Sequence, residues 1–182
     1  MKVLIAFDQA TQISGYSVWN IETKELIDWG TLKATKGKAT QRINTMKHGI
    51  IEMLFKYHDV EYVILEDIQY QENKEKENAK IEFGKPAFQG GTNVKTFKTL
   101  AWMQGVILDL CHEKGIKTEL FYSSTWKSFC EIRGYSRPAQ KAQSIEFVKN
   151  KFNIDPTTDE ADAICLGWMA VNNINKKTGV EI

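Results

Sequence analysis

The sequence predicts an α/β domain whose mixed five-stranded sheet has three antiparallel strands first, then parallel strands, with helices flanking it. Two observations support this fold class. Three short runs rich in strand formers fill the first 32 residues with brief connections, which is typical of an antiparallel meander. Later apolar runs alternate with segments of helical spacing, as they do where helices connect parallel strands. A chain of 182 residues fits a single domain, 1–182.

The strands are predicted from runs of apolar and β-branched residues. Residues 3–8 (VLIAFD) are apolar at consecutive positions, which indicates a central strand buried on both faces. Residues 15–21 and 25–32 complete the meander. Residues 61–66 (EYVILE) form a second buried strand, and 117–121 (KTELF) form the last.

Four helices are predicted from apolar spacing, at residues 39–57, 98–112, about 138–151 and about 158–173. The second helix has an apolar face that fits either a dimer interface or ordinary core, and core is slightly favoured. The residues of this face are Trp102, Met103, Val106, Ile107 and Leu110.

Residues 69–97 differ from the rest of the chain. They hold nine charged residues and four glycine or proline residues, with little apolar periodicity. So long a segment inside a compact domain is usually functional or disordered. Because it begins three residues after Glu66, we expect a mobile loop that faces the substrate.

Composition excludes several classes of protein. The net charge of +1 does not indicate a general polyanion binder, but residues 123–151 hold six basic and two acidic residues, a local surplus of 6 − 2 = +4. That surplus fits a phosphate-binding surface or a solvated helix face about equally well.

Three scattered cysteines exclude a disulfide scaffold and indicate a reducing cytoplasm. Neither a membrane span nor a signal peptide is expected.

Four carboxylates from three distant segments are predicted to meet at one edge of the sheet. Asp8 and Glu66 each end a buried strand, and neighbouring parallel strands end at the same edge. Asp159 and Asp162 share a face at the start of the last helix. Carboxylates placed together repel unless they are protonated or hold a cation. Oxygen ligands without a nearby His or Cys favour Mg²⁺ or Mn²⁺ over zinc, and two such ions support in-line displacement at phosphorus.

Each acid taken alone has a simpler interpretation. Asp8 would fit a turn cap, and Asp159 would complement the helix dipole. Thr157 and Glu160 have the spacing of a capping box, so we assign Glu160 to the helix start. Asp67 should point away from the site, because adjacent side chains alternate along a strand. Only the four carboxylates together favour a metal site.

Three motifs in order give the chain a family resemblance. They are Phe7-Asp8 followed by Ser14-Gly15-Tyr16, then Ile64-Leu65-Glu66, then Asp159-Glu160-Ala161-Asp162-Ala163. With them the sequence resembles the RuvC family of Holliday junction resolvases, within the RNase H and retroviral-integrase superfold, and most closely the bacteriophage members. The resemblance covers about residues 2–172 and implies an RNase H-like fold.

The resemblance also implies residue roles. Two Mg²⁺ ions, or Mn²⁺ in their place, would be held by four carboxylates. These are Asp8, Glu66, Asp159 and Asp162. Lys127 and Lys141 would lie near the scissile phosphate, where a positive charge stabilises the transition state, although both could be ordinary surface lysines. Basic residues of the 123–151 stretch would contact DNA: Lys127, Arg133, Arg137 and Lys141.

The chain departs from the bacterial members at two places. Gln9-Ala10 stands where they usually have Pro-Gly. They also place an aromatic residue three positions after the Glu, where this chain has Gln69 followed by Tyr70. Tyr70 is therefore the candidate contact to the junction centre, and their cleavage-sequence preference is not expected to carry over. The loop's phenylalanines could stack on bases if it binds DNA: Phe83, Phe88 and Phe97.

The sequence thus predicts a crossover junction endodeoxyribonuclease. It would cut four-way and other branched DNA by paired nicks that leave 5′-phosphates, as a homodimer, in the host cytoplasm if it is phage-encoded. One alternative is a related nuclease for flaps, forks or RNA–DNA hybrids. A remote alternative is an actin- or sugar-kinase-like nucleotide-binding protein, but Gln9-Ala10-Thr11 lacks the glycines expected there.

Overall fold

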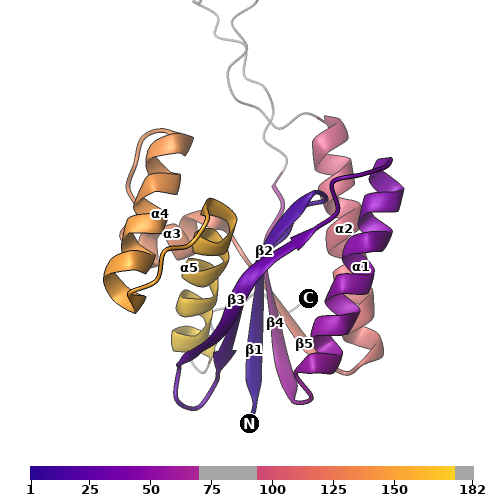
Figure 1. Ribbon diagram of the computed structural model, residues 1–182, viewed down its shortest axis with the longest axis horizontal. Coiled ribbons are helices and arrows are strands. Elements are labelled where there is room, and N and C mark those ends of the chain that lie inside the picture. The colour runs from indigo at the N-terminus through magenta and orange to yellow at the C-terminus, as the bar shows by residue number, and fades with distance from the viewer. Residues whose placement is uncertain (70–93, 175–182) are drawn as a thin grey trace, which may run out of the picture.

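The computed structural model describes residues 1–69 and 94–174, and it contains one mixed five-stranded sheet in the order β3-β2-β1-β4-β5 (Figure 1). The antiparallel pairs are β1–β2 and β2–β3, and the parallel pairs are β1–β4 and β4–β5. The predicted fold class is therefore confirmed. The strands are β1 (Val3–Asp8), β2 (Ile13–Asn20), β3 (Leu26–Lys33), β4 (Val60–Glu66) and β5 (Lys117–Phe121).

Helices cover both faces of the sheet. Two helices lie on one face, and the last helix lies on the other face with two more helices packed beyond it (Figure 1). In chain order they are α1 (Ala39–Lys56), α2 (Val94–Glu113), α3 (Ser123–Phe129), α4 (Arg137–Phe152) and α5 (Thr158–Asn173).

The alternation of side chains along β1 explains its continuous apolar run. Val3, Ile5 and Phe7 pack toward α1 and α2, whereas Leu4 and Ala6 pack toward α5. Every residue of β1 before Asp8 is buried, so a charge at its end is confined to the sheet edge.

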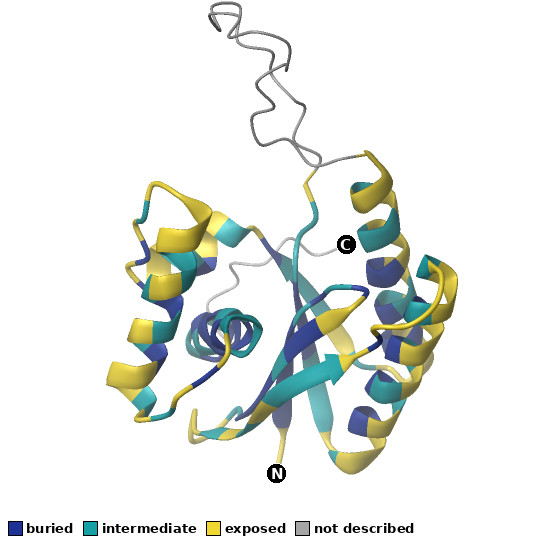
Figure 2. Ribbon diagram, turned by 45° about the horizontal axis from the view of Figure 1, so that its top comes forward, coloured by how far each residue is buried: buried dark blue, intermediate teal, exposed yellow. Residues whose placement is uncertain are grey.

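Helix α5 packs against β2 and is buried over most of its length (Figure 2). The hydroxyl of Ser17 donates to the carbonyl of Ala163 at 2.7 Å, and the indole of Trp19 donates to Ser17 at 2.9 Å. A β-carbon on Gly167 would lie 2.1 Å from the indole nitrogen of Trp19. Glycine at that position therefore permits the close packing that fixes α5 on the sheet.

The structure corrects two sequence predictions. Helix α3 was not expected, because its seven residues bury only Trp126 and show no periodicity. Helix α2 begins at Val94, so residues 94–97 belong to a helix and not to the loop predicted at 69–97. Three of these four residues are exposed, which removed the apolar signal. Residues 70–93 and 175–182, with Tyr70, Phe83 and Phe88, lie outside the described residues.

The apolar face of α2 belongs mainly to the core. Met103, Ile107 and Leu110 are buried against α1 and the sheet, which confirms the core interpretation for them, while Trp102 is 54% exposed. All three cysteines are buried and free, in line with the absence of a disulfide scaffold. Within the two described ranges, no helix is long and apolar enough to cross a membrane.

Candidate active site

Asp8 and Glu66 lie side by side at one edge of the sheet. Strands β1 and β4 are parallel neighbours, and Phe7 pairs with Leu65 immediately before the two acids. Helix α5 begins at the same end of the sheet (Figure 1). The topology thus brings together the three segments that the sequence predicted to meet.

A single amide side chain connects the ends of β1 and β4. The side-chain nitrogen of Gln9 donates to the carbonyl oxygen of Glu66, and the backbone N–H of Glu66 donates back to the Gln9 side-chain oxygen at 3.1 Å. Gln9 is itself buried. Both backbone polar groups of Glu66 are therefore satisfied by the residue that follows Asp8, and Gln9 acts as a positioning residue for the acid pair.

The Ser14-Gly15 motif closes the β1–β2 turn and admits α5. Ser14 accepts a hydrogen bond from the Ala10 N–H at 2.9 Å and donates to the Ala10 carbonyl at 2.7 Å. A β-carbon on Gly15 would lie 1.9 Å from the carbonyl oxygen of Asp159, closer than any side chain can approach. The missing side chain of Gly15 therefore sets where the first turn of α5 meets β2.

The predicted capping box fixes the start of α5. Thr157 is the N-cap: its hydroxyl accepts from the Glu160 N–H at 3.4 Å, and the Glu160 carboxylate accepts from the Thr157 N–H at 2.7 Å. Glu160 therefore has the structural role assigned from the sequence. Asp159 lies in the first turn of the helix, and Asp162 follows three residues later on the same face.

The carboxylates shift one another's titration. The protein atoms around Asp8 withdraw its carboxylate from water, and the negative charges of Asp162, Glu66 and Asp159 add to this effect, which together raise the pKa of Asp8 to about 8. Burial also raises the pKa of Glu66 and that of Asp162 above their ordinary values. A group of acids that oppose one another's ionisation is typical of a functional site.

Three of the four predicted cations act on these acids. Lys127 lies close enough to lower the pKa values of Glu66 and Asp162, and Arg137 acts on Glu66 in the same direction. Lys141 forms an ion pair with Asp159, with 3.5 Å between the ammonium nitrogen and the carboxylate oxygen.

Arg133 is placed differently from the other three cations. It is exposed, and its described contact is from its backbone N–H to the side chain of Gln143, at 2.9 Å. Among the described residues, no hydrogen bond or ion pair joins the Arg133 side chain to the carboxylates.

Two further residues, Trp126 at the site and Tyr135 close to Arg137 in the sequence, were not predicted from the sequence. The Trp126 indole N–H donates to the Glu66 carboxylate at 2.9 Å, and this bond opposes the effect of burial on the pKa of Glu66. Tyr135 is fully exposed two residues before Arg137. A tryptophan in a short helix gives no periodic signal, and only its bond to Glu66 reveals its place at the site. A tyrosine in a loop gives none either, and Tyr135 is distinguished by its exposure close to Arg137 in the sequence.

The donor set fits a hard divalent cation. Carboxylate oxygens from three elements face one edge, and they oppose one another's charge in the absence of a cation. Among the described residues, no three acidic, histidine or cysteine side chains already converge as a metal cage.

Comparison with known proteins identifies the fold. No family model and no curated protein matches the chain.

Three solved structures that resemble it are all of resolvases. Thermus thermophilus RuvC in complex with a Holliday junction substrate matches with a TM-score of 0.72 and 14% identity, over 99% of both chains. A further Thermus thermophilus RuvC structure gives 0.66 and 15%, again over 99% of both chains. The fowlpox virus Holliday junction resolvase gives 0.58 and 14%, over 94% of this chain and 99% of that one. The chain therefore has the RNase H-like fold of the RuvC-type resolvases, as the sequence resemblance implied.

Proposed function

We propose that this protein is a metal-dependent endonuclease that resolves four-way DNA junctions and cuts other branched DNA. The observation that supports it best is the meeting of carboxylates from β1, β4 and α5 at one edge of a resolvase-like fold. One similar structure is bound to a Holliday junction substrate, which supports branched DNA as the substrate class.

The four acids would hold two divalent ions, Mg²⁺ or in its place Mn²⁺. The ligands would be Asp8, Glu66, Asp159 and Asp162. Ions bound there would supply an activated water and stabilise the leaving oxygen of the phosphodiester. The chain's own contribution is to keep the carboxylates partly withdrawn from water and at fixed backbone positions, through the Gln9 bonds and the α5 cap.

Two lysines would neutralise the phosphate. Lys127 and Lys141 each act electrostatically on the acids, so both lie within reach of an anion placed among them. Their positive charge would stabilise the charge that develops on the phosphate oxygens during the displacement. Both are only partly exposed, so solvent screens them less than it screens an open surface lysine.

The start of α4 would contact the DNA beyond the cleaved bond. Arg137 lies near Glu66 and is exposed, and Tyr135 is exposed just before it. Arginine binds backbone phosphates, and an exposed aromatic ring beside it offers a surface for an unpaired base at a branch point. Cutting two strands as paired nicks requires two sites, so we propose that the active form is a homodimer.

Cleavage of a labelled synthetic four-way junction with Mg²⁺ tests the proposal. A linear duplex, a fork, a flap and an RNA–DNA hybrid are assayed beside it. Wild type should leave paired nicks with 5′-phosphates in the junction, and Asp8→Asn should bind the junction but not cut it. Asp67→Asn is the matched control and should cut normally. If wild type cuts none of these substrates with Mg²⁺ or Mn²⁺, the nuclease proposal is wrong.

A further inference from the structure

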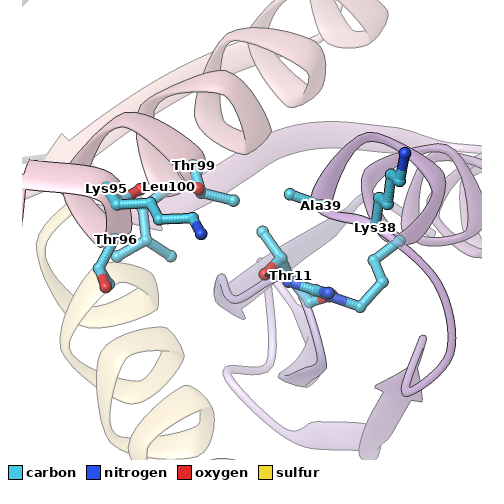
Figure 3. Close-up of a pocket in the computed structure, with 8 residues that line it drawn as sticks. Thr11, Lys38, Ala39, Lys95, Thr96, Thr99 and Leu100 are labelled. Atoms are coloured by element: carbon cyan, nitrogen blue, oxygen red, sulfur yellow. Dashed lines mark hydrogen bonds between the residues drawn. The ribbon is translucent and has the colours of Figure 1, made fainter.

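A basic pocket lies on the α1–α2 side of the sheet edge, separate from the carboxylates on the α5 side. Its volume is about 530 Å³, and three segments line it (Figure 3). Thr11 comes from the β1–β2 turn, Lys38 and Arg42 come from the start of α1, and Lys95 comes from the start of α2. No Asp or Glu is among the described residues that line it.

Arg42 is held in place by neutral groups. Its Nε donates to the Thr11 carbonyl at 3.2 Å, one terminal nitrogen donates to the Gly37 carbonyl at 2.8 Å, and the other donates to the Thr11 hydroxyl at 3.4 Å. None of the ion pairs between described residues involves Arg42. A guanidinium has five N–H donors, so two remain after these three bonds. Its position is fixed, and no described acidic side chain neutralises its charge.

The two lysines of the pocket lie at helix N-termini, where the helix dipole disfavours a positive charge. Neither α1 nor α2 has an acid in its first turn, and lysines stand at these positive helix ends instead. A cation at a helix N-terminus is unfavourable, and a bound anion would offset its charge. The side chain of Lys95 points from α2 toward Thr11, whereas the ammonium of Lys38 points away (Figure 3). Arg42 and Lys95 are therefore the principal cations of the pocket.

Hydroxyl groups complete a lining suited to a tetrahedral oxyanion. The Thr11 hydroxyl accepts from Arg42 and keeps its own hydrogen available for donation. Thr96 is exposed at the same helix start, whereas the Thr99 hydroxyl already donates to the Lys95 carbonyl at 2.7 Å. Two cations and hydroxyl groups, with no carboxylate among the described lining residues, match the requirements of a phosphate group.

We propose that this pocket binds a backbone phosphate of the DNA whose branch point occupies the active site. The inference rests on the proposed function. Thr11 follows Asp8 by three residues, so the turn that lines the pocket directly continues the strand that carries an active-site acid. DNA that contacts the carboxylates on one side of this turn and the pocket on the other would be held by two points of a short backbone segment. Its position relative to the carboxylates would thereby be fixed. Such a contact positions the duplex and reads no sequence.

The test measures binding of a fluorescent four-way junction to the full-length protein in EDTA, across a series of NaCl concentrations. Lys95→Gln and Arg42→Gln should each weaken binding and reduce the slope of log K against log salt by about 0.9, the value for one phosphate contact. Lys114→Gln, an exposed lysine after the other end of α2, is the matched control and should leave affinity and slope unchanged. Lys95 is exposed and its replacement leaves the Arg42 bonds intact, so this variant answers the question even if Arg42→Gln unfolds.

Three results would overturn the inference. If wild type binds the junction and Lys95→Gln binds with the same affinity and slope, the pocket does not contact DNA, while the nuclease proposal stands. If inorganic phosphate stabilises wild type but not Lys95→Gln, and junction binding is equal in both, the ligand is a free phosphate compound and not DNA. If wild type binds no branched DNA, the proposed function fails together with the pocket's assignment.

Discussion

Replacing Asp8 with asparagine should stabilise the metal-free protein while it abolishes cleavage. The perturbation replaces an ionisable carboxyl group with a neutral amide and preserves the shape of the side chain. Within residues 1–69 and 94–174, no described hydrogen bond or ion pair involves the Asp8 side chain, so the substitution breaks no described contact. What it removes is a carboxylate whose ionised form is disfavoured by burial and by three neighbouring acids.

The size of the effect follows from the pKa of Asp8, which rises from 3.8 to about 8 on folding. Between these values the folded state holds a proton that the unfolded chain has released, so the free energy of unfolding falls as the pH rises. The loss is about 1.4 kcal/mol per pH unit, and the roughly three units up to neutral pH give about 4 kcal/mol as an upper value. For a chain of this size that corresponds to a Tm difference of about 10 °C.

Thermal unfolding in EDTA, followed by circular dichroism at several pH values, measures the difference. Asp8→Asn should have the higher Tm at neutral pH, and the gap should narrow toward pH 4. Adding Mg²⁺ should raise the Tm of wild type, because a ligand of the folded state stabilises it, and should raise that of Asp8→Asn much less. Asp67→Asn is again the control.

Equal or lower stability of Asp8→Asn in EDTA at neutral pH would refute the electrostatic argument. A difference in Tm that does not change with pH would also refute it. The predicted difference arises only where the unfolded chain has released the Asp8 proton and the folded protein has retained it. Equal Mg²⁺ stabilisation of both proteins would remove Asp8 from the proposed ligand set.

The remaining predictions concern the groups around the acids. Trp126→Phe removes the N–H that Glu66 accepts, so the pKa of Glu66 should rise further, and the acidic limb of the cleavage pH profile should move up by about one unit or more; an unmoved limb would contradict this role. Gly15→Ala should lower the free energy of unfolding by about 1–3 kcal/mol or more, seen as a lower Tm, and should reduce cleavage, because the new β-carbon would displace Asp159. Gly105→Ala is the control: no atom lies within 4 Å of its new β-carbon, so it should be neutral or stabilising. Tyr135→Ala should weaken junction binding several-fold in a fluorescence titration while Tyr135→Phe retains it, as a stacking contact requires; equal loss in both would exclude stacking.

The fold could be predicted because its main signals are local. Strands β1 and β4 are recognisable in the sequence as continuous apolar runs, because helices cover both faces of each strand. The meander and the Thr157 cap depend on residues close in sequence. Helix α3 could not be predicted in this way, because seven residues with one buried tryptophan do not complete a periodic pattern.

The candidate site was predictable where topology alone brings residues together. Asp8 and Glu66 required only the rule that neighbouring parallel strands end at one edge. The bonds of Gln9 and Trp126 to Glu66 required three-dimensional positions, because 57 and 60 residues separate them from Glu66. The basic pocket was invisible for the same reason, since its cations come from two helix starts that look like ordinary solvated surface in the sequence.

The bonds of Gln9 have a consequence for how such a protein can change. The N–H and the carbonyl of Glu66 are both satisfied by Gln9, and the N–H of Asp67 donates to the Phe121 carbonyl at 2.8 Å. The backbone of the acid is thus anchored to both neighbouring strands before the chain leaves the sheet. Whatever sequence is attached after Asp67 can be lengthened, shortened or exchanged without moving the carboxylate. Under the proposed function, that connection is where a change of sequence is expected to alter substrate preference and leave the Glu66 carboxylate in place.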